Sequence, residues 1–352
     1  MQLHCEPSAV ILKKVLTQEL DQLTLDAVAE LDEIKARGYW EQVWLRFKRD
    51  RVAIGSFFVI VALILVAFPG AWIAQKLLGH GPNDIFLSGE HAGVDDRLVP
   101  VGPLSWVDKP DGSRTLFILG GDGTLGRDLF LRLLYGARVS LEVAVFSTMG
   151  VMVVGTLLGA IAGFYRGWID TVISRTIEIT MAFPALLFII ALASTIGTRL
   201  DAITLGGLFP QGVVTLVMVF TVFGWFFPAR VVRSQVLSLR EKEFIEAARM
   251  VGASDWRIVR SHVLPHLVAP IIVFSTLLVA GFVLFEAGLS FLGLGVKLPT
   301  ASWGNLLAAG PDFYTVQPWL MIWPGLAVLM TTLAFNLLGD GLRDAFDPRS
   351  SR

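Results

Sequence analysis

Six apolar stretches, each about 20 residues long, constrain the fold of this chain more than any other feature. At about 1.5 Å per residue, a helix of roughly 20 apolar residues crosses the hydrocarbon core of a bilayer. The stretches are continuously apolar rather than alternating, which excludes a β-barrel. We therefore predict an all-α polytopic membrane protein with six transmembrane helices, at residues 52–73, 139–164, 177–196, 213–232, 268–289 and 318–338.

The basic residues predict the orientation of these helices. Arg46, Lys48, Arg49 and Arg51 stand directly before the first stretch, and the positive-inside rule places such clusters in the cytoplasm. About 50 residues precede this stretch and the first ten lack a basic n-region, so we do not expect a cleaved signal peptide. Six crossings then place both termini in the cytoplasm. The other segments that fall on the predicted inner side contain Arg166, Arg175, Arg230, Arg233, Arg240, Lys242, Arg249, Arg257, Arg260, Arg343, Arg349 and Arg352.

Composition removes several functional classes. Charged residues make up 17% of the chain, against about 25% in soluble domains. The 29 basic and 30 acidic residues give a formal charge of -1, which provides no electrostatic attraction for nucleic acid. A single cysteine, Cys5, excludes a disulfide framework. We expect membrane lipid, and not nucleic acid, around this chain.

Motifs for catalysis and cofactor binding are not found in the sequence. It contains neither a GxxxxGK[ST] phosphate loop nor a GxSxG nucleophile motif. His262 and His266 have the i, i+4 spacing of a zinc pair, but Pro265 lies between them and a third ligand is missing. We therefore expect no catalytic residues, no metal and no cofactor in this chain.

The composition along the chain suggests five parts. Acidic and leucine residues interleave near the N-terminus, which predicts an amphipathic cytoplasmic helix that either covers the bundle or binds a partner. Residues 79–126 are rich in Gly, Pro and Asp and predict an irregular outer loop. The parts are an acidic extension (1–45), a first transmembrane helix with its basic lead-in (46–75), an extracytoplasmic loop (76–135), a permease core (136–342) and a cytoplasmic tail (343–352).

Small and acidic residues inside the apolar stretches need an explanation. Gly155, Gly159 and Gly163 recur every four residues, which favours close helix packing over a ligand role. An ionised carboxylate in lipid costs several kcal/mol, so Glu142 and Glu286 must face water or protein. For Glu142 we favour hydrogen bonding to neighbours. For Glu286 that interpretation and a contact along a solute pathway are equally supported.

The polar segment 240–266 between the fourth and fifth stretches has the pattern of a compact projection. Residues 241–250 are good helix formers, Gly252 tolerates a positive φ, and Ser254 can cap a second helix. We expect a helix, a tight turn and a second helix that Pro265 interrupts. Ala247 and Ala248 are small enough to allow close docking in a groove of another protein.

The same segment resembles the EAA loop of binding-protein-dependent ABC importer permeases. The resemblance rests on Glu246, Ala247, Ala248, Gly252, Leu264 and Pro265, with His262 where the general pattern has isoleucine. Segments from about residue 44 to 349 are similar to the second, C-type permease of the dipeptide, oligopeptide and nickel branch. These segments are WLRFKR (44–49), GRD (126–128), YGARVSL (135–141), GWID (167–170), AFP (182–184), LSFLGLG (289–295), SWG (302–304) and LRDAFDP (342–348); Gly121 replaces the usual threonine of the GTDxxGRD segment.

This resemblance implies a type I ABC importer fold and a non-catalytic permease subunit in a bacterial or archaeal plasma membrane. Its implied partners are a second homologous permease, two cytoplasmic ATPases that bind ATP and Mg, and an extracytoplasmic substrate-binding protein. Glu246 and Arg249 would contact the ATPase. Ala247, Ala248 and Gly252 would provide fit and turn geometry, and Leu264 and Pro265 would anchor the loop.

Several functions remain open at this point. The resemblance favours di- or oligopeptides as solutes, with nickel complexes, glutathione or antibiotic peptides as alternatives within the family. An ion-driven secondary transporter would usually show inverted repeats and midplane charges, and neither is evident. A membrane anchor that scaffolds cytoplasmic partners is the remaining alternative.

Overall fold

A computed structural model describes residues 38–88, 90–200 and 203–347. The chain divides into two units, 1–46 and 47–352, and helix α2 (Tyr39–Arg49) crosses their boundary. The predicted N-terminal amphipathic helix falls almost entirely outside the described residues. The architecture below is that of the second unit.

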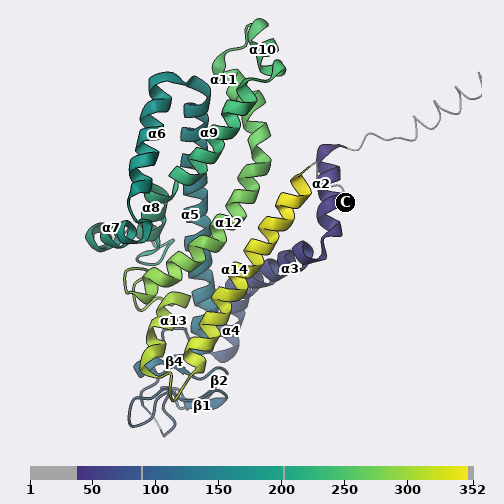
Figure 1. Cartoon of the computed structure of the whole chain (residues 1–352). Helices are drawn as coiled ribbons and strands as arrows, with labels where there is room; N and C mark the ends of the chain where they lie inside the picture. The colour runs from purple at the N-terminus through teal and green to yellow at the C-terminus, as the bar shows by residue number, and fades with distance from the viewer. Residues whose placement is uncertain (1–37, 89, 201–202, 348–352) are drawn as a thin grey trace, which may run out of the picture. The chain divides into compact units, whose positions relative to one another are not determined.

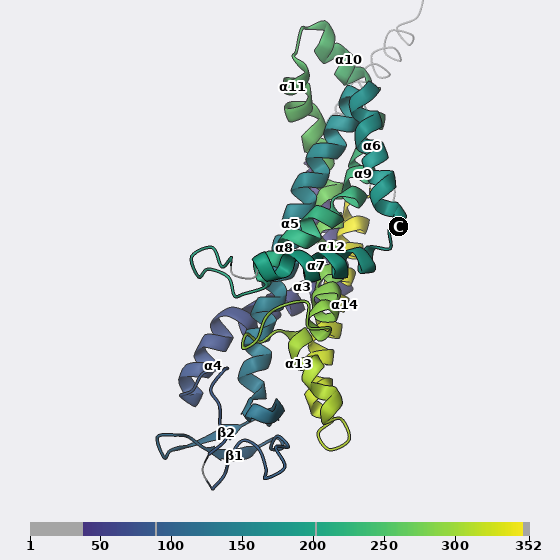
Figure 2. The same cartoon turned by 90° about the vertical axis from the view of Figure 1, so that its left-hand side faces the viewer.

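Most of the expected membrane helices are present as long apolar helices (Figures 1 and 2). Among the described residues, four segments are long and apolar enough to cross a membrane, and two bent helix pairs raise this number to six. The six transmembrane helices predicted from the sequence agree with the count of six, in which each bent pair is one span. The four segments are Arg51–Leu78, Leu129–Tyr165, Asp255–Phe291 and Trp319–Phe346.

The segment Arg51–Leu78 combines α3 (Arg51–Leu65), a π-helical turn (Val66–Gly70) that contains Pro69, and α4 (Ala71–Leu78). Asp50 caps α3, because its carboxylate accepts hydrogen bonds from the backbone N–H groups of Val52 and Ala53.

The third and fourth apolar stretches are bent helix pairs. Helices α6 (Gly167–Ala182) and α7 (Ala185–Leu200) meet at 90°, and α8 (Val213–Gly224) and α9 (Phe226–Arg240) meet at 42°. Pro184 explains the sharper bend. It has no N–H to donate and forces the preceding residue, Phe183, into an extended conformation (φ -87°, ψ 139°).

Pro265 does not interrupt its helix, contrary to our expectation. Helix α11 (Asp255–Ile258) continues through a π-helical turn (Val259–Val263) into α12 (Leu264–Phe291). The wider π turn lies directly before the proline, so the helix proceeds without the hydrogen bond that Pro265 cannot donate.

The segment before α5 is not irregular throughout, which corrects the prediction for residues 79–126. Strands β1 (Ser105–Asp108) and β2 (Arg114–Phe117) form an antiparallel hairpin in which Asp108 pairs with Arg114. Strands β3 (Gly121–Asp122) and β4 (Arg127–Asp128) form a second antiparallel pair. The Asp111-Gly112 turn is a hairpin signal that the loop-like composition concealed.

A small core stabilises this hairpin segment. Phe86, Val107 and Phe117 are buried together. The backbone N–H of His91 donates to Asp108 Oδ2 at 2.9 Å, and this bond holds the pKa of the partly exposed carboxyl below its usual range. The segment joins α5 through Asp128, which caps α5 and accepts a hydrogen bond from His80 Nε2 at 2.9 Å.

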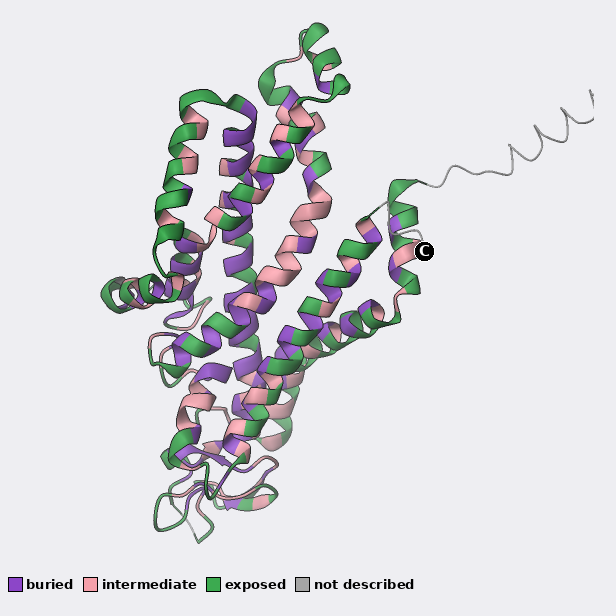
Figure 3. Ribbon diagram, in the orientation of Figure 1, coloured by how far each residue is buried: buried purple, intermediate pink, exposed green. Residues whose placement is uncertain are grey.

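Helix α5 (Leu129–Tyr165) is central to the second unit and packs on α8, α9 and α12. Figure 3 shows buried residues along its length. Helix α14 (Trp319–Phe346) packs on α3, on α12 and on the short α13 (Trp303–Ala309). Helices α10 (Glu243–Met250) and α11 lie at one end of α5, and the two hairpins lie at its other end (Figure 1).

Glycines let α5 and α9 approach at backbone distance, as the sequence predicts. A Cβ built on Gly155 would lie 2.8 Å from Pro228 Cβ, and one on Gly163 would lie 2.8 Å from Arg233 O. At Gly159 it would lie 2.5 Å from Ala229 O and 2.9 Å from Val232 Cβ. Real Cβ atoms do not come this close to backbone, so larger residues would force the helices apart.

We predict that Gly159→Val destabilises the α5–α9 crossing. The added side chain overlaps the backbone of α9, and such overpacking costs about 1 to 3 kcal/mol. Thermal unfolding of the purified chain in detergent should show a lowered midpoint. Gly281→Val is the matched control, because no described atom within 4 Å meets a Cβ built at that helical glycine. Equal unfolding midpoints of the two variants would contradict the proposed packing role.

Candidate functional site

The polar segment 240–266 forms a projection beyond α9 and α12, which we call the α10–α11 projection (Figure 1). Helix α9 ends at Arg240, α10 spans Glu243–Met250 and α11 begins at Asp255. Ser254 occupies the N-cap position of α11, where its carbonyl accepts from Ile258 N at 3.0 Å, but its side chain makes no capping hydrogen bond. The predicted helix, turn and helix are confirmed.

A left-handed glycine makes the turn of this projection. Gly252 has φ +84°, and its N–H donates to Arg249 O at 2.9 Å. The N–H of Ala253 donates to Ala248 O at 3.0 Å. These two bonds form a Schellman motif, which closes a helix with a glycine at this position. The backbone conformation, rather than lack of space, is what favours glycine here, because no described atom lies within 4 Å of a Cβ built on Gly252.

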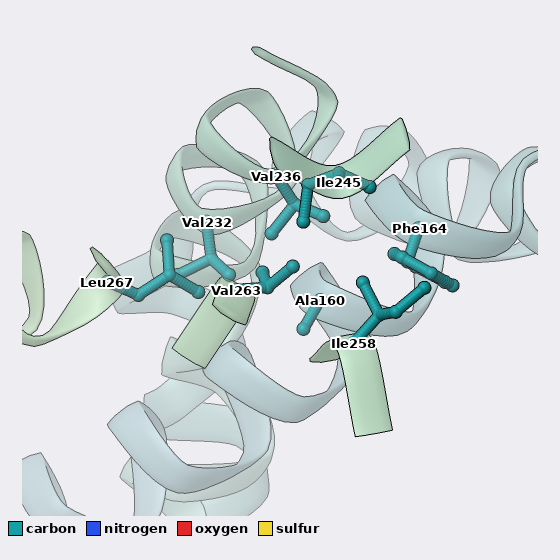
Figure 4. Packing of buried hydrophobic residues seen from close by; sticks show 8 residues of the cluster. All are labelled: Ala160, Phe164, Val232, Val236, Ile245, Ile258, Val263 and Leu267. Atoms are coloured by element: carbon teal, nitrogen blue, oxygen red, sulfur yellow. The ribbon is translucent and has the colours of Figure 1, made fainter. Parts of the chain in front are cut away.

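Buried aliphatic side chains fix both short helices to the membrane helices. Ile245 of α10 and Ile258 of α11 are fully buried in one cluster (Figure 4). The other members come from three long helices and the π turn, so the projection and the bundle share one core. They are Ala160, Phe164, Val232, Val236, Val263 and Leu267.

Polar contacts join the projection to the end of α5. Arg240 Nη1 donates to Phe164 O at 2.5 Å, and the guanidinium of Arg249 lies 5.5 Å from the Phe164 ring centroid. Arg166 and Glu241 form an exposed ion pair at 2.6 Å. Because Phe164 also belongs to the buried cluster, α10 and the end of α5 pack against the same side chains.

The residues singled out from the sequence divide between the two faces of the projection. Ala248 and Leu264 pack against the buried cluster. Glu246, Ala247 and Arg249 are exposed on α10, and Pro265 is exposed at the start of α12. Ala248 and Leu264 can therefore anchor the projection while Glu246 and Ala247 stay available to a partner, and Arg249 is exposed but also packs on Phe164.

Sequence reasoning missed three apolar residues at the tip of the projection. Met250, Val251 and Trp256 are 83%, 90% and 65% exposed. An exposed tryptophan beside exposed aliphatic residues is typical of a protein-binding surface. The available signal was the presence of Trp256 within an otherwise polar segment.

His262 and His266 have structural contacts. His266 Nδ1 lies 2.6 Å from His262 O, and its ring stacks on Phe244 with centroids 5.3 Å apart. Within the described part of the chain, no group of three or more His, Cys, Asp or Glu side chains could hold a metal ion.

Glu286 lies away from the projection, fully buried where α5, α12 and α13 meet. Ser140 Oγ and Ser290 Oγ donate to its two carboxylate oxygens at 2.6 and 2.7 Å, and Ser302 also hydrogen-bonds it. Each serine oxygen in turn accepts from a backbone N–H: that of Trp303 for Ser140, of Val296 for Ser290 and of Asn305 for Ser302. A contact between Glu286 and solute stays a prediction.

Glu142 has the environment that we favoured for it. Its Oε1 accepts from Arg138 Nε at 2.7 Å, one helical turn away on α5. This ion pair lies beside an apolar cavity of about 400 Å³ that includes Phe68 and Phe146 in its lining. The other carboxylate oxygen, Oε2, is buried without a hydrogen-bond partner among the described residues, so the ion pair provides only part of the hydrogen bonding that we favoured.

Comparison with known proteins places these features in one family. Residues 155–352 match the binding-protein-dependent transport system inner membrane component, and residues 38–90 match the N-terminal TM domain of oligopeptide transport permease C. The first match includes the α10–α11 projection.

Curated relatives match nearly the whole chain. The glutathione transport system permease protein GsiD of Pectobacterium atrosepticum is 37% identical over 88% of this chain and 91% of its own length. The dipeptide transport system permease protein DppC of Alkalihalophilus pseudofirmus is 35% identical over 90% of this chain and 92% of its own length. A solved structure of the MetNI methionine ABC transporter in inward-facing conformations is 19% identical, covering 61% of this chain and 96% of that one, with a TM-score of 0.49.

The extent of these matches confirms the resemblance seen in the sequence. The first family model includes the α10–α11 projection, and the relatives exceed one third identity over most of both chains. This chain therefore belongs to the family of binding-protein-dependent transport system inner membrane components, as a multi-pass permease subunit of an ABC importer.

Proposed function

We propose that this chain forms a peptide pathway together with a second homologous permease and transmits work from two cytoplasmic ATPases through the α10–α11 projection. The observation that carries the proposal is the way in which this projection is packed onto the membrane helices. Its tip is exposed and apolar, while Ile245 and Ile258 fix its base in a core shared with the membrane helices. A surface built in this way can bind a partner and pass on its movement.

The mechanism follows from this rigid connection. Binding and hydrolysis of ATP, with Mg, in the partner subunits would move the projection. Because Phe164, Val236 and Leu267 belong to its core, α5, α9 and α12 would move with it. Interfaces of this kind switch between discrete packings rather than deforming continuously. The chain itself would leave ATP hydrolysis to these partners, since its sequence lacks a phosphate-binding loop.

Short peptides are the solute class that the relatives support. One is named for dipeptide transport and the other for glutathione, which is itself a tripeptide. An extracytoplasmic binding protein would deliver the peptide to the end that carries the hairpins, and both termini would lie in the cytoplasm. The family assignment favours this ATP-driven import over the ion-driven transporter and the scaffold considered above.

We predict that Gly252→Val uncouples ATP hydrolysis from uptake while the chain still inserts. Valine at φ +84° strains the turn by roughly 1 to 2 kcal/mol and shifts α10 against the ATPase. In proteoliposomes that contain the full transporter and its binding protein, dipeptide uptake should fall about tenfold or more while ATP hydrolysis persists. Gly112→Val is the control, because Gly112 has φ +80° and a similarly open environment in the β1–β2 turn. Normal uptake by the Gly252 variant would make the coupling assignment wrong.

We predict that Trp256→Ala weakens binding of the ATPase subunits. An exposed tryptophan at the centre of an interface typically contributes 2 kcal/mol or more, so the dissociation constant should rise about thirtyfold. Affinity can be measured with purified ATPase and the permease pair in nanodiscs. Trp168→Ala provides a matched loss of an exposed tryptophan at the start of α6. If the two variants bind ATPase equally well, Trp256 does not lie in the interface.

We predict that Glu286→Ala lowers stability because it leaves the hydroxyl groups of Ser140, Ser290 and Ser302 without their acceptor. Unpaired buried groups of this kind should cost about 2 to 4 kcal/mol in total, and Glu286→Gln should cost less. Thermal unfolding measures this effect, with Glu178→Ala, an exposed glutamate of α6, as the control. Uptake per folded transporter distinguishes a purely structural role of Glu286 from a contact with the solute. Uptake rates equal to those of the wild type across several peptides would exclude the solute contact.

A further inference from the structure

A cavity of about 490 Å³, lined by both charged and apolar residues, lies at the opposite end of the unit from the projection. It is bounded by the paired strands β3 and β4, the beginning of α5, the end of α12 and the short helix α13. The ionisable residues in its lining are Asp122, Arg127, Arg132 and Lys297, and Asn305 adds an amide. None of the functional roles proposed above uses these side chains.

Positive charge exceeds negative charge in this lining. Arg132 Nε lies 2.5 Å from Asp122 Oδ2, and Arg127 Nη2 lies 3.4 Å from the same oxygen. These three side chains are almost completely buried, at 1% exposure for Arg132, 2% for Asp122 and 11% for Arg127. One carboxylate therefore faces two guanidinium groups, and Lys297 lines the same space. Glu286 lies behind Ser290 and is hydrogen-bonded to serines, so it does not line the cavity.

A donor and an acceptor in this lining are unmatched. Within the described chain, Arg127 Nε and Asp122 Oδ1 are buried without a hydrogen-bond partner, and the buried Arg132 Nε has only its ion pair with Asp122 Oδ2. Leaving such groups unpaired costs about 1 to 3 kcal/mol each. A ligand that presents an anionic acceptor next to an N–H donor would satisfy both of them.

Arg132 differs from Arg127 because its guanidinium also donates hydrogen bonds to neighbouring loops. Its Nη1 donates to Asn83 Oδ1 at 2.8 Å and to Pro299 O at 3.1 Å, which ties the start of α5 to two loops. These bonds hold Arg132 as part of the wall. Arg127 and Asp122 retain unused hydrogen-bonding capacity, so they are the groups that can recognise a ligand.

We propose that this cavity binds the C-terminal end of a short peptide. The terminal carboxylate would accept from Arg127, and the last peptide N–H would donate to Asp122 Oδ1. A charge-assisted bond to a guanidinium is about twice as strong as a neutral one, so the carboxylate dominates recognition. The inference rests on the proposed peptide transport and adds to it a contact at the hairpin end of the permease.

Direct binding to the full chain tests this inference. The chain is reconstituted in nanodiscs of phosphatidylethanolamine and phosphatidylglycerol and titrated with dialanine, with dialanine C-terminal amide and with inorganic phosphate. We expect dialanine to bind at least tenfold more tightly than its amide or phosphate. Arg127→Gln should remove this preference, whereas Arg114→Gln, an arginine of the β1–β2 hairpin outside the cavity lining, should preserve it.

Three results would overturn the inference. Equal binding of dialanine and its amide would show that the carboxylate is not recognised, and phosphate binding as tight as dialanine would indicate a general anion site. A chain that binds none of the three probes would have a cavity filled by water. The comparison of ligands on the wild-type chain holds even if Arg127→Gln fails to fold.

Uptake by the assembled transporter separates this inference from the proposed function. If the complex imports dialanine but the chain does not distinguish it from its amide, the cavity assignment fails and the transport proposal stands. If the chain prefers dialanine but the complex imports no peptide, the transport proposal fails and the carboxylate site stands.

Discussion

The close approach of α5 and α9 is the contact on which the rest of this structure depends. Gly155, Gly159 and Gly163 place the backbone of one helix against the side chains and carbonyl groups of the other. Without a hydrophobic driving force between helices in lipid, such packing is a main source of association. The same crossing brings Ala160 and Phe164 of α5 beside Val232 and Val236 of α9. Ile245 and Ile258 of the projection pack against these four residues in one buried cluster.

The long helices and the projection could be predicted from sequence because each has a local cause. Continuous apolar runs predict membrane helices, and Gly252 after a run of helix formers predicts the turn that its φ of +84° confirms. The effect of a proline on its helix could not be predicted from the proline alone, because it depends on the backbone conformation of the residues before it. Pro184 breaks a helix with a 90° bend, whereas Pro265 follows a π turn and is tolerated.

The features that could not be predicted depend on contacts between distant parts of the chain. Glu286 and Ser140 are 146 residues apart, and Arg132 meets Pro299 across 167 residues. No periodicity or motif encodes such pairs. The β1–β2 hairpin was missed for the opposite reason, since its strands have four residues each and their signal is weaker than the surrounding Gly, Pro and Asp.

Two continuous helices connect the two ends of the second unit. Helix α5 begins beside Arg132 and its ion pair with Asp122, and it ends at the buried Phe164. Helix α12 contributes Leu267 to the cluster under the projection and Ser290 to the lining of the 490 Å³ cavity. If a partner displaced the projection, the cavity walls would move with it unless α5 or α12 bent. Pro270 inside α12 and the π turn before Leu264 interrupt the regular hydrogen bonding of the helix, so they are the places where α12 can bend.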